Sequence, residues 1–119
     1  MWPARLSPRQ QQGQHYERQA EAHLLKRGLK AVESNYRCRG GEIDLIMRDG
    51  ATLVFVEVRQ RASASHGGAA ASISNEKKRR LVAAAQNYLL RYREIPPCRF
   101  DVIAIDGAAV DWISNAIEA

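Results

Sequence analysis

The segment from Glu42 to Val58, EIDLIMRDGATLVFVEV, constrains the fold of this chain more than any other. Two runs rich in apolar and β-branched residues flank Asp49-Gly50, and an Asp-Gly pair between such runs is a strong signal for a β-hairpin. Any fold for this chain must therefore contain two antiparallel strands that are neighbours in one sheet.

Alternate residues of a strand point to opposite faces, so this hairpin places acids among apolar side chains. In the first strand we expect Asp44 to share a face with Glu42 and Ile46, and Ile43 to share the other face with Leu45. In the second strand, the acid Glu57 shares a face with Leu53, Phe55 and Arg59.

The turn sets the distance between Asp44 and Glu57. With Asp49-Gly50 as a two-residue turn, these two acids are diagonal neighbours across the strands. A slip of two residues would set them directly opposite each other, whereas an odd slip would place them on different faces. The hairpin therefore predicts a pair of neighbouring carboxylates.

Carboxylates at cross-strand distance repel each other, so such a pair needs a cation or a raised pKa. Oxygen ligands suit Mg²⁺ or Mn²⁺, whereas zinc would favour histidine and cysteine, and the hairpin contains neither. The competing interpretation is a ladder of surface salt bridges formed by Glu42, Asp44, Glu57 and Arg59. The strand pattern alone favours neither interpretation.

Helical and extended patterns on both sides of the hairpin indicate an α/β fold. Gln11 to Arg27 has helical spacing and ends at Gly28, which suits a C-terminal cap. Ser74 or Asn75 can cap a second helix, which ends before Pro96-Pro97. Further strands are expected at Lys30 to Tyr36, Arg99 to Ile105 and Val110 to Ile113, and a loop at Arg61 to Ser74. This order predicts a mixed sheet with helices on its faces.

One acid of the first helix, Glu17, lies on a stripe of small and apolar residues at helical spacing. An acid on such a stripe is out of place unless it is used, which makes Glu17 a third candidate for the acidic site. Glu21, one turn later, is the competing candidate. If Glu21 is the inward acid, Glu17 is a solvated side chain.

Length and composition allow one domain. With 119 residues, 45% of them hydrophobic, the chain can form a single core, which we place at residues 11–119 after a disordered tail at residues 1–10. No apolar run approaches the ~20 residues of a membrane helix, and the N-terminus lacks the apolar segment of a signal peptide. Cys38 and Cys98 form no metal-binding or disulfide pattern. We therefore expect a cytoplasmic protein that does not contact a membrane.

The net charge of +5 favours a polyanionic partner. Four consecutive cations, Lys77, Lys78, Arg79 and Arg80, fall in the first turns of the second helix, where positive charge opposes the helix dipole. A basic run at this place favours phosphate binding over the common alternative, a solvated helix face. Further cations that we expect along the same groove are Arg37, Arg39 and Arg61.

Four stretches of the sequence resemble the YraN-like family of uncharacterised bacterial proteins. They are GQHYERQA with LLKRG, then NYRCRGGEIDLIMRDG, then LVFVEVRQR, and finally EKKRRLVAAAQNYL with RFDVI. The match runs from Gly13 to Ile105. Its most specific parts are GEIDLI and FVEVRQR at their mutual spacing, because the helix fragments alone are common patterns.

The resemblance implies both a fold and a site. The family is similar to the Holliday-junction-resolvase branch of the PD-(D/E)xK nucleases, which implies a restriction-endonuclease-like α-β-β-β-α-β core with a mixed sheet flanked by helices. By this resemblance Glu17, Asp44 and Glu57 would hold Mg²⁺ or Mn²⁺, and Lys77 would be the leading phosphate ligand. Arg59 stands where the superfamily usually has lysine. An arginine stays protonated and cannot be a general base, but it can stabilise developing negative charge.

These observations predict a metal-dependent endonuclease that hydrolyses phosphodiester bonds in DNA, with branched DNA as one candidate substrate and RNA as an alternative. Its catalytic residues would be Glu17, Asp44, Glu57 and Arg59, and the resemblance also implies a homodimer. The alternative is a non-catalytic nucleic-acid-binding module that keeps the fold, because Arg59 replaces the usual lysine. A protein-interaction domain with a basic face ranks last, since it leaves the carboxylates unexplained.

Overall fold

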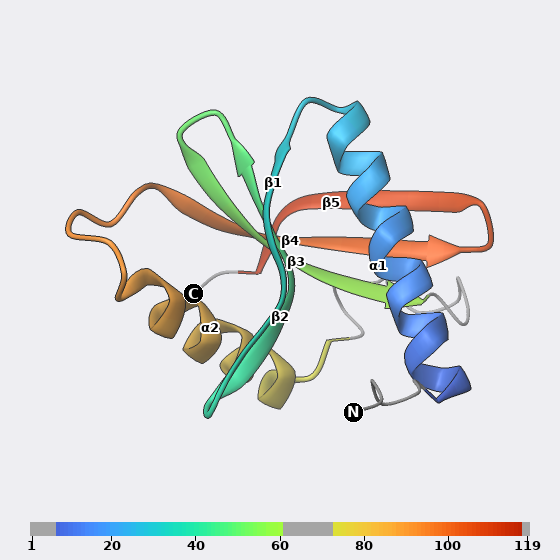
Figure 1. Cartoon of the computed structure of the whole chain (residues 1–119), viewed down its shortest axis with the longest axis horizontal. Coiled ribbons are helices and arrows are strands. Elements are labelled where there is room, and N and C mark those ends of the chain that lie inside the picture. Colours follow the sequence, from blue (N-terminus) through green and yellow to red (C-terminus); the bar gives the residue numbers. More distant parts are fainter. Residues whose placement is uncertain (1–6, 61–72, 118–119) are drawn as a thin grey trace, which may run out of the picture.

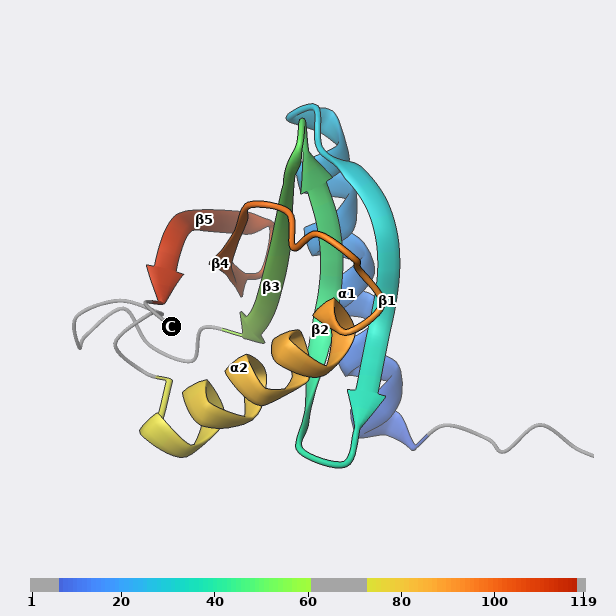
Figure 2. The ribbon, with the colours of Figure 1, turned by 90° about the vertical axis from the view of Figure 1, so that its left-hand side faces the viewer.

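A five-stranded sheet with one helix on each face organises the part of the chain that the computed structural model describes, residues 7–60 and 73–117. Figures 1 and 2 show the two helices on opposite sides of this sheet. The elements are α1 (Pro8–Lys26), β1 (Lys30–Cys38), β2 (Gly41–Asp49), β3 (Thr52–Gln60), α2 (Asn75–Leu89), β4 (Cys98–Asp106) and β5 (Ala109–Ile117).

The strands follow the order of the sequence across the sheet, β1-β2-β3-β4-β5. Neighbours joined by short turns are antiparallel, namely β1 with β2, β2 with β3 and β4 with β5. Strands β3 and β4 are parallel, because the connection through α2 returns the chain to the end of the sheet where β3 began. The expected α/β class with a mixed sheet is confirmed.

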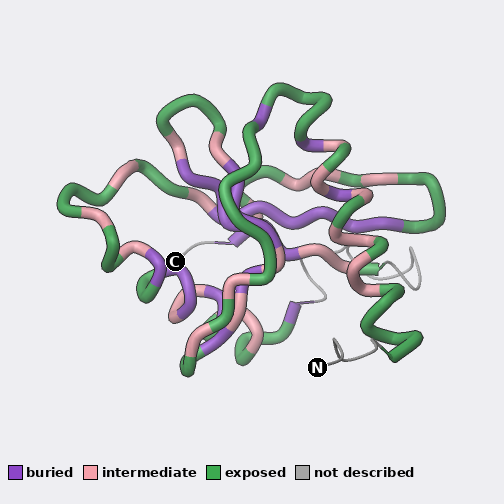
Figure 3. The backbone as a smooth tube through the Cα atoms, in the orientation of Figure 1, coloured by how far each residue is buried: buried purple, intermediate pink, exposed green. Residues whose placement is uncertain are grey.

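Apolar side chains cover both faces of the sheet, so the domain has two cores. On the α1 face, Ala20 and Leu24 pack against strand residues that include Val56. On the α2 face, Leu81 packs in a cluster with Phe55. Figure 3 shows the burial concentrated in the central strands and in one side of each helix. Within residues 7–60 and 73–117, neither helix is long and apolar enough to span a bilayer.

Helix α1 begins at Pro8 rather than at Gln11, the residue that the helical spacing predicted. Ser7 is the N-cap: its hydroxyl accepts a hydrogen bond from the backbone N–H of Gln10 at 3.1 Å, and its own N–H donates to the Gln10 side chain at 2.8 Å. This capping box, with proline in the first turn, explains the earlier start. The tail expected at residues 1–10 is therefore too long, because residues 8–10 are helical.

The remaining boundaries lie close to those that the sequence predicted. Helix α2 begins at Asn75 with Ser74 as its N-cap, as expected. Strand β1 continues past Tyr36 to Cys38. Most of the predicted loop, residues 61–72, lies outside the described residues.

The turn between β2 and β3 is shifted by one residue from the predicted Asp49-Gly50. Asp49 pairs with Thr52, which leaves a two-residue turn that starts at Gly50. Gly50 has a positive φ of 60°, which a tight hairpin turn of this kind requires. The pairing is the alternative that is slipped by two residues, and its continuation sets Asp44 directly opposite Glu57.

Strand β1 contains an irregularity that accompanies a change of face in β2. Asn35 has a positive φ of 54° and lies between Ser34, which pairs with Leu45, and Tyr36, which pairs with Ile43. Leu45 belongs to the core on the α1 face, whereas Ile43 belongs to the core on the α2 face. The expectation that Ile43 and Leu45 share a face is therefore wrong, because the regular alternation breaks between them.

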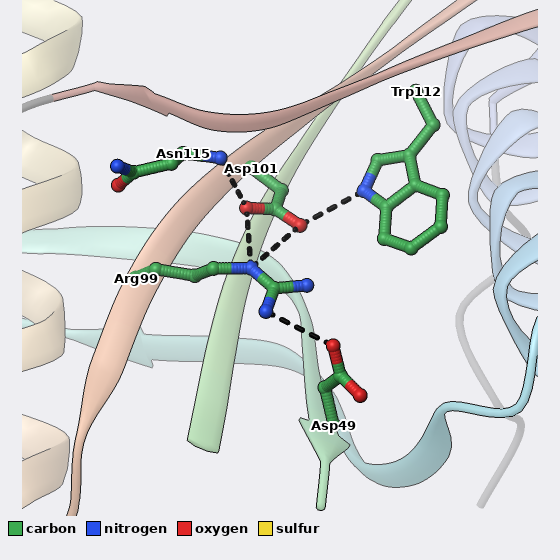
Figure 4. A network of polar contacts seen from close by, with 5 residues as sticks. All are labelled: Asp49, Arg99, Asp101, Trp112 and Asn115. Carbon is green, nitrogen blue, oxygen red and sulfur yellow. Dashed lines mark hydrogen bonds and ion pairs between the residues drawn. The ribbon is translucent and has the colours of Figure 1, made fainter.

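A buried carboxylate, Asp101 of β4, links β4 to β5 and, through Arg99, to the end of β2 (Figure 4). It accepts hydrogen bonds from the indole Nε1 of Trp112 and from the backbone N–H of Asn115, each at 2.8 Å. Arg99 Nε donates to it at 3.1 Å, and the same guanidinium reaches Asp49 at 3.0 Å. Trp112 is thus a hydrogen-bond donor to this buried carboxylate.

Strand β5 carries the second irregularity of the sheet. Asn115 also has a φ of 54°, and the pairing of β4 with β5 shifts between Phe100 and Val102. The backbone N–H of Asn115 is satisfied by a carboxylate rather than by a strand partner. The strand can therefore continue to Ile117, beyond the Ile113 that the sequence predicted as its end.

The β1–β2 hairpin packs against α2 at Gly41. A Cβ atom built on Gly41 would lie 2.0 Å from the backbone carbonyl oxygen of Arg80. One built on Gly40 would lie 3.3 Å from the Cβ atom of Ala83, which is tight but tolerable. Only glycine at position 41 allows the hairpin to approach the helix backbone this closely.

We expect Gly41→Ala to lower the free energy of unfolding by about 3 kcal/mol, because the backbone of α2 would have to move. Gly40→Ala is the matched control and should cost no more than about 1 kcal/mol, since only side-chain contact tightens. Urea denaturation followed by circular dichroism measures both values. Equal effects of the two substitutions would contradict the close approach of Gly41 to Arg80.

Candidate functional site

Strands β2 and β3 separate at Asp44, and the candidate site lies in the fork between them. The ladder between the two strands ends at the pair Leu45 and Val56, while β3 stays paired with β4 beyond that point. Figure 1 shows the two strands diverging. Asp44 Oδ2 accepts a hydrogen bond from the backbone N–H of Val58 at 2.8 Å. The carboxylate thus takes the place of a ladder partner and is fixed within the sheet.

Glu57 is the buried acid of the fork. Its side chain is 3% exposed, and it hydrogen-bonds with Asp44. Burial, and then the neighbouring Asp44, raise the pKa of Glu57 to about 9, although the ammonium of Lys77 opposes this rise. At neutral pH and without a bound cation, Glu57 therefore carries a proton that stabilises the carboxyl pair.

Lys77 brings an ammonium group into the fork. Its Nζ lies 3.4 Å from Glu57 Oε2 and 3.7 Å from Glu42 Oε1. Ser74 positions the lysine, because its hydroxyl caps α2 by accepting a hydrogen bond from the Lys77 N–H at 3.1 Å. The other cations of the run, which form no ion pair with the described residues, are Lys78, Arg79 and Arg80. Within the described structure, Lys77 is the member of the run that contacts the acids.

Glu17 approaches the fork from α1. Burial, and then the charge of Asp44, raise the pKa of Glu17, while a hydrogen bond with Asn35 and the charge of Arg37 lower it. Glu17 lines the same hollow as Asp44. Glu21 lines a smaller hollow of about 230 Å³ beside β1. Glu17, rather than Glu21, is therefore the acid of α1 that lies next to the fork.

Two hollows meet at the fork. The first, of about 590 Å³, lies between the start of α1, the end of β3 and the start of α2. The second, of about 400 Å³, extends from Asp44 towards the β1–β2 hairpin. Both are lined by Gly13, Glu17 and Asp44. Further side chains of the first hollow are Arg9, Gln12, Tyr16, Arg59, Ser74 and Lys77.

The donor chemistry of the fork suits a hard divalent cation. Asp44 and Glu57 are close enough to share a proton, which a cation can replace. In the described part of the chain, no three acidic, histidine or cysteine side chains converge on one ion, so Glu17 is a neighbour of the pair. Mg²⁺ needs no third protein ligand, since it commonly binds one or two carboxylates and retains water. The residues present therefore fit Mg²⁺ or Mn²⁺ at the pair.

The remaining predicted site residues divide between the hollows and their surroundings. Arg59 lines the first hollow from β3. Arg37 lines the second, where its Nε lies 3.5 Å from Glu42. Arg39 is exposed at the turn of the β1–β2 hairpin. Arg61 lies outside the described residues.

Asn35 is a site residue that the sequence pattern did not predict. Its side chain hydrogen-bonds with Glu17, and its positive φ marks the break in β1 opposite Asp44. The available signal was an asparagine inside a strand pattern, since asparagine is depleted in regular strands and tolerates left-handed backbone. The start of α1 was missed as well, because helical spacing identified only the apolar stripe of that helix.

The fold and the fork define the class of this chain: an α/β domain with a carboxyl pair where two central strands of a mixed sheet separate. A family model described as "Uncharacterised protein family UPF0102" matches residues 16–105. The chain belongs to this family, which confirms the YraN-like resemblance.

Relatives of similar length support this membership. A UPF0102 protein from Herminiimonas arsenicoxydans is 58% identical over 111 residues, which cover 93% of this chain and 90% of the relative. A UPF0102 protein from Janthinobacterium sp. (strain Marseille) is 57% identical and covers 98% of both chains. One from Aeromonas hydrophila is 53% identical and covers 87% of this chain and 82% of the relative. The segment matched by the family model contains all the acids of the fork and Lys77.

Glu57→Gln is expected to stabilise the metal-free protein above neutral pH. The folded state holds the Glu57 proton up to about pH 9, whereas the unfolded chain releases it near 4.5, so stability falls as pH rises between these values. Glutamine stays uncharged and keeps a donor for Asp44. The gain in free energy of unfolding should be on the order of 2 kcal/mol at pH 8 in EDTA and small at pH 5.

Chemical denaturation at both pH values measures this gain. Glu94→Gln is the matched control, because Glu94 is an exposed acid outside both hollows, and its stability should not change. A gain for Glu57→Gln that is equal at pH 5 and pH 8 would contradict the raised pKa.

Proposed function

We propose that this protein is a metal-dependent phosphodiester hydrolase that acts as a DNA endonuclease. The observation that carries the proposal is the fork, where buried Glu57 meets Asp44 beside the ammonium of Lys77. Burying an acid beside a second acid is costly even when one of them holds a proton, so such a pair at this place favours a functional role. A strongly perturbed acid with a defined charge partner in a hollow is typical of catalytic sites.

Asp44 and Glu57 would hold Mg²⁺ or Mn²⁺, with Glu17 as an adjacent acid that can orient water. When bound, such an ion polarises a phosphate and lowers the pKa of a water ligand. The contribution of the chain is to fix both carboxylates in advance, since the N–H of Val58 holds Asp44 and Lys77 contacts Glu57. Side chains held in this way need no rearrangement during the reaction.

Lys77 and Arg59 would have different roles at the scissile phosphate. Arg59 stays protonated, so it can bind a phosphate oxygen and stabilise negative charge but cannot accept a proton. The ammonium of Lys77 lies 3.4 Å from Glu57, so it would position this carboxyl group and bind a phosphate oxygen beside it. Lys77 on α2 would thus hold an acid of the carboxyl pair, whereas Arg59 of β3 would act on the phosphate alone.

The element order supports the finer fold assignment within this proposal. Helix α1, strands β1 to β3, helix α2 and strand β4 follow the α-β-β-β-α-β order of the restriction-endonuclease-like core, and β5 adds an edge strand. The fork also lies where the acids of GEIDLI and FVEVRQR meet, which are the motifs that carry the family resemblance.

Positive charge around the fork supports a nucleic acid as the substrate. The chain has a net charge of +5. Gly41 packs against the backbone of Arg80, so the hairpin that carries Arg37 and Arg39 adjoins the basic turns of α2. These two segments would bind phosphates on either side of the fork, which favours DNA or RNA over a small phosphate ester. A homodimer would present two forks to a branched DNA substrate.

Cleavage assays test the proposed activity. Labelled duplex, single-stranded and four-way-junction DNA, and an RNA strand, are incubated with the protein in Mn²⁺, Mg²⁺ or EDTA. The Asp44→Ala, Glu57→Ala double variant removes the pair, and Glu94→Ala is the exposed-acid control. We expect cleavage that requires the metal and falls at least about 100-fold in the double variant only.

The same assay contains the outcome that would overturn the activity. If salt-sensitive binding persists while wild-type protein cuts no substrate with any metal, the chain is the non-catalytic nucleic-acid-binding module. Cleavage that is unchanged in EDTA would instead show that the carboxyl pair holds no essential metal.

Lys77→Met separates the proposed role of Lys77 from general phosphate binding. Loss of the cation that positions Glu57 should lower kcat by about 100-fold with a small change in KM. Lys78→Met is the matched control on the same helix turn and should raise KM less than about tenfold while leaving kcat unchanged. Equal effects of the two variants on kcat would show that Lys77 is one phosphate ligand among several.

A further inference from the structure

Gly13 lies in α1, where glycine has no evident structural purpose. A glycine inside a helix destabilises it relative to alanine. A Cβ atom built on Gly13 would meet no atom of the described residues within 4 Å. Neither close packing nor an unusual backbone therefore accounts for glycine here, and the space beside it is open to a ligand.

The space beside Gly13 adjoins both hollows of the fork, and we call it the passage. Gly13, Glu17 and Asp44 line both the hollow of about 590 Å³ and the hollow of about 400 Å³. Helix α1 therefore borders the passage on one side, and β2 borders it at Asp44 on the other. A large side chain on Gly13 would project into the junction of the two hollows.

Acids line the passage beside the cations. The first hollow has three cations, Arg9, Arg59 and Lys77, together with the three acids of the fork. The second hollow is acidic, because Arg37 is the one cation among its described lining residues and pairs with Glu42. A phosphate backbone would therefore be held by the cations of the first hollow, with one phosphate beside Asp44, and a divalent ion at the carboxyl pair would offset the acids.

The α1 wall of the passage carries groups that suit bases. Gln12 and Tyr16 line the first hollow, and Gln10 and Gln14 line the second. Glutamine amides hydrogen-bond with base edges, and an aromatic ring can stack on a base. Bases of an unpaired strand are free to stack on such a ring.

We propose that Gly13 determines the substrate class, because the bare helix backbone lets a single unpaired DNA strand pass between α1 and the fork. The inference rests on the proposed nuclease function and names its substrate: a single-stranded segment, such as an end or the unpaired arm of a branch. A duplex would have to bring a second strand through the same passage and is disfavoured.

Three variants of α1 test this inference. Gly13→Leu and Gly13→Gln place large side chains in the passage, one apolar and one polar, so the result does not depend on a single variant that folds. Gln11→Leu is the matched control, because Gln11 is exposed on the same helix and lines neither hollow. Melting temperature and Mn²⁺ binding by calorimetry establish that each variant keeps the fold and the carboxyl pair.

The readout is binding of a fluorescein-labelled single-stranded oligonucleotide, and of the same sequence as a blunt duplex, in Ca²⁺, followed by cleavage in Mn²⁺. Wild-type protein should bind the single strand more tightly than the duplex. Both Gly13 variants should weaken single-strand binding at least about tenfold, because a side chain blocks the passage. Their melting temperatures should rise by about 4 °C, since glycine leaves the helix, and Mn²⁺ affinity should not change.

Two results would overturn the inference: single-strand binding that both Gly13 variants retain in full, or a wild-type preference for the duplex. Because binding is measured separately from cleavage, the passage is tested even if no substrate is cut. Absence of cleavage by wild-type protein with normal single-strand binding would contradict the proposed activity and leave the role of Gly13 supported.

Discussion

The hydrogen bond from the Val58 N–H to the Asp44 carboxylate is the contact on which the architecture of the site depends. Where two central strands separate, their inner backbone groups lose partners inside the protein, and an unsatisfied N–H there is costly. Asp44 solves this problem with a side chain. One carboxylate therefore supports the scaffold and supplies a charged group to Glu57, so the geometry of the site is built into the sheet.

The sequence correctly predicted the helices and strands and the proximity of Asp44 and Glu57. One assumption behind the predicted proximity was wrong. Regular alternation in β2 was assumed, whereas the strand changes face between Ile43 and Leu45. This change is accompanied by a left-handed backbone at Asn35 in the neighbouring strand, and a pattern within one strand carries no information about its partner. The fork itself depends on long-range pairing, which local periodicity does not encode.

The position of Lys77 shows a similar limit. The basic run was visible in the sequence, but which of its members reaches the acids depends on the angle at which α2 crosses the sheet. Gly41 packs against the backbone of α2 and Ser74 caps the helix, and of these two contacts only the cap is readable from local sequence. The start of α1 was readable in principle, since Ser7 and Gln10 have capping-box spacing, but the apolar stripe begins later.

Both edge strands of the sheet are interrupted by an asparagine with a positive φ, Asn35 in β1 and Asn115 in β5. The register of β5 with β4 shifts across Asn115, and that of β1 with β2 shifts earlier, between Ala31 and Glu33. A straight strand of another molecule could not pair continuously along either edge, because the exposed backbone N–H and C=O groups are not regularly spaced. The interruptions therefore protect a highly β-structured chain against edge-to-edge aggregation.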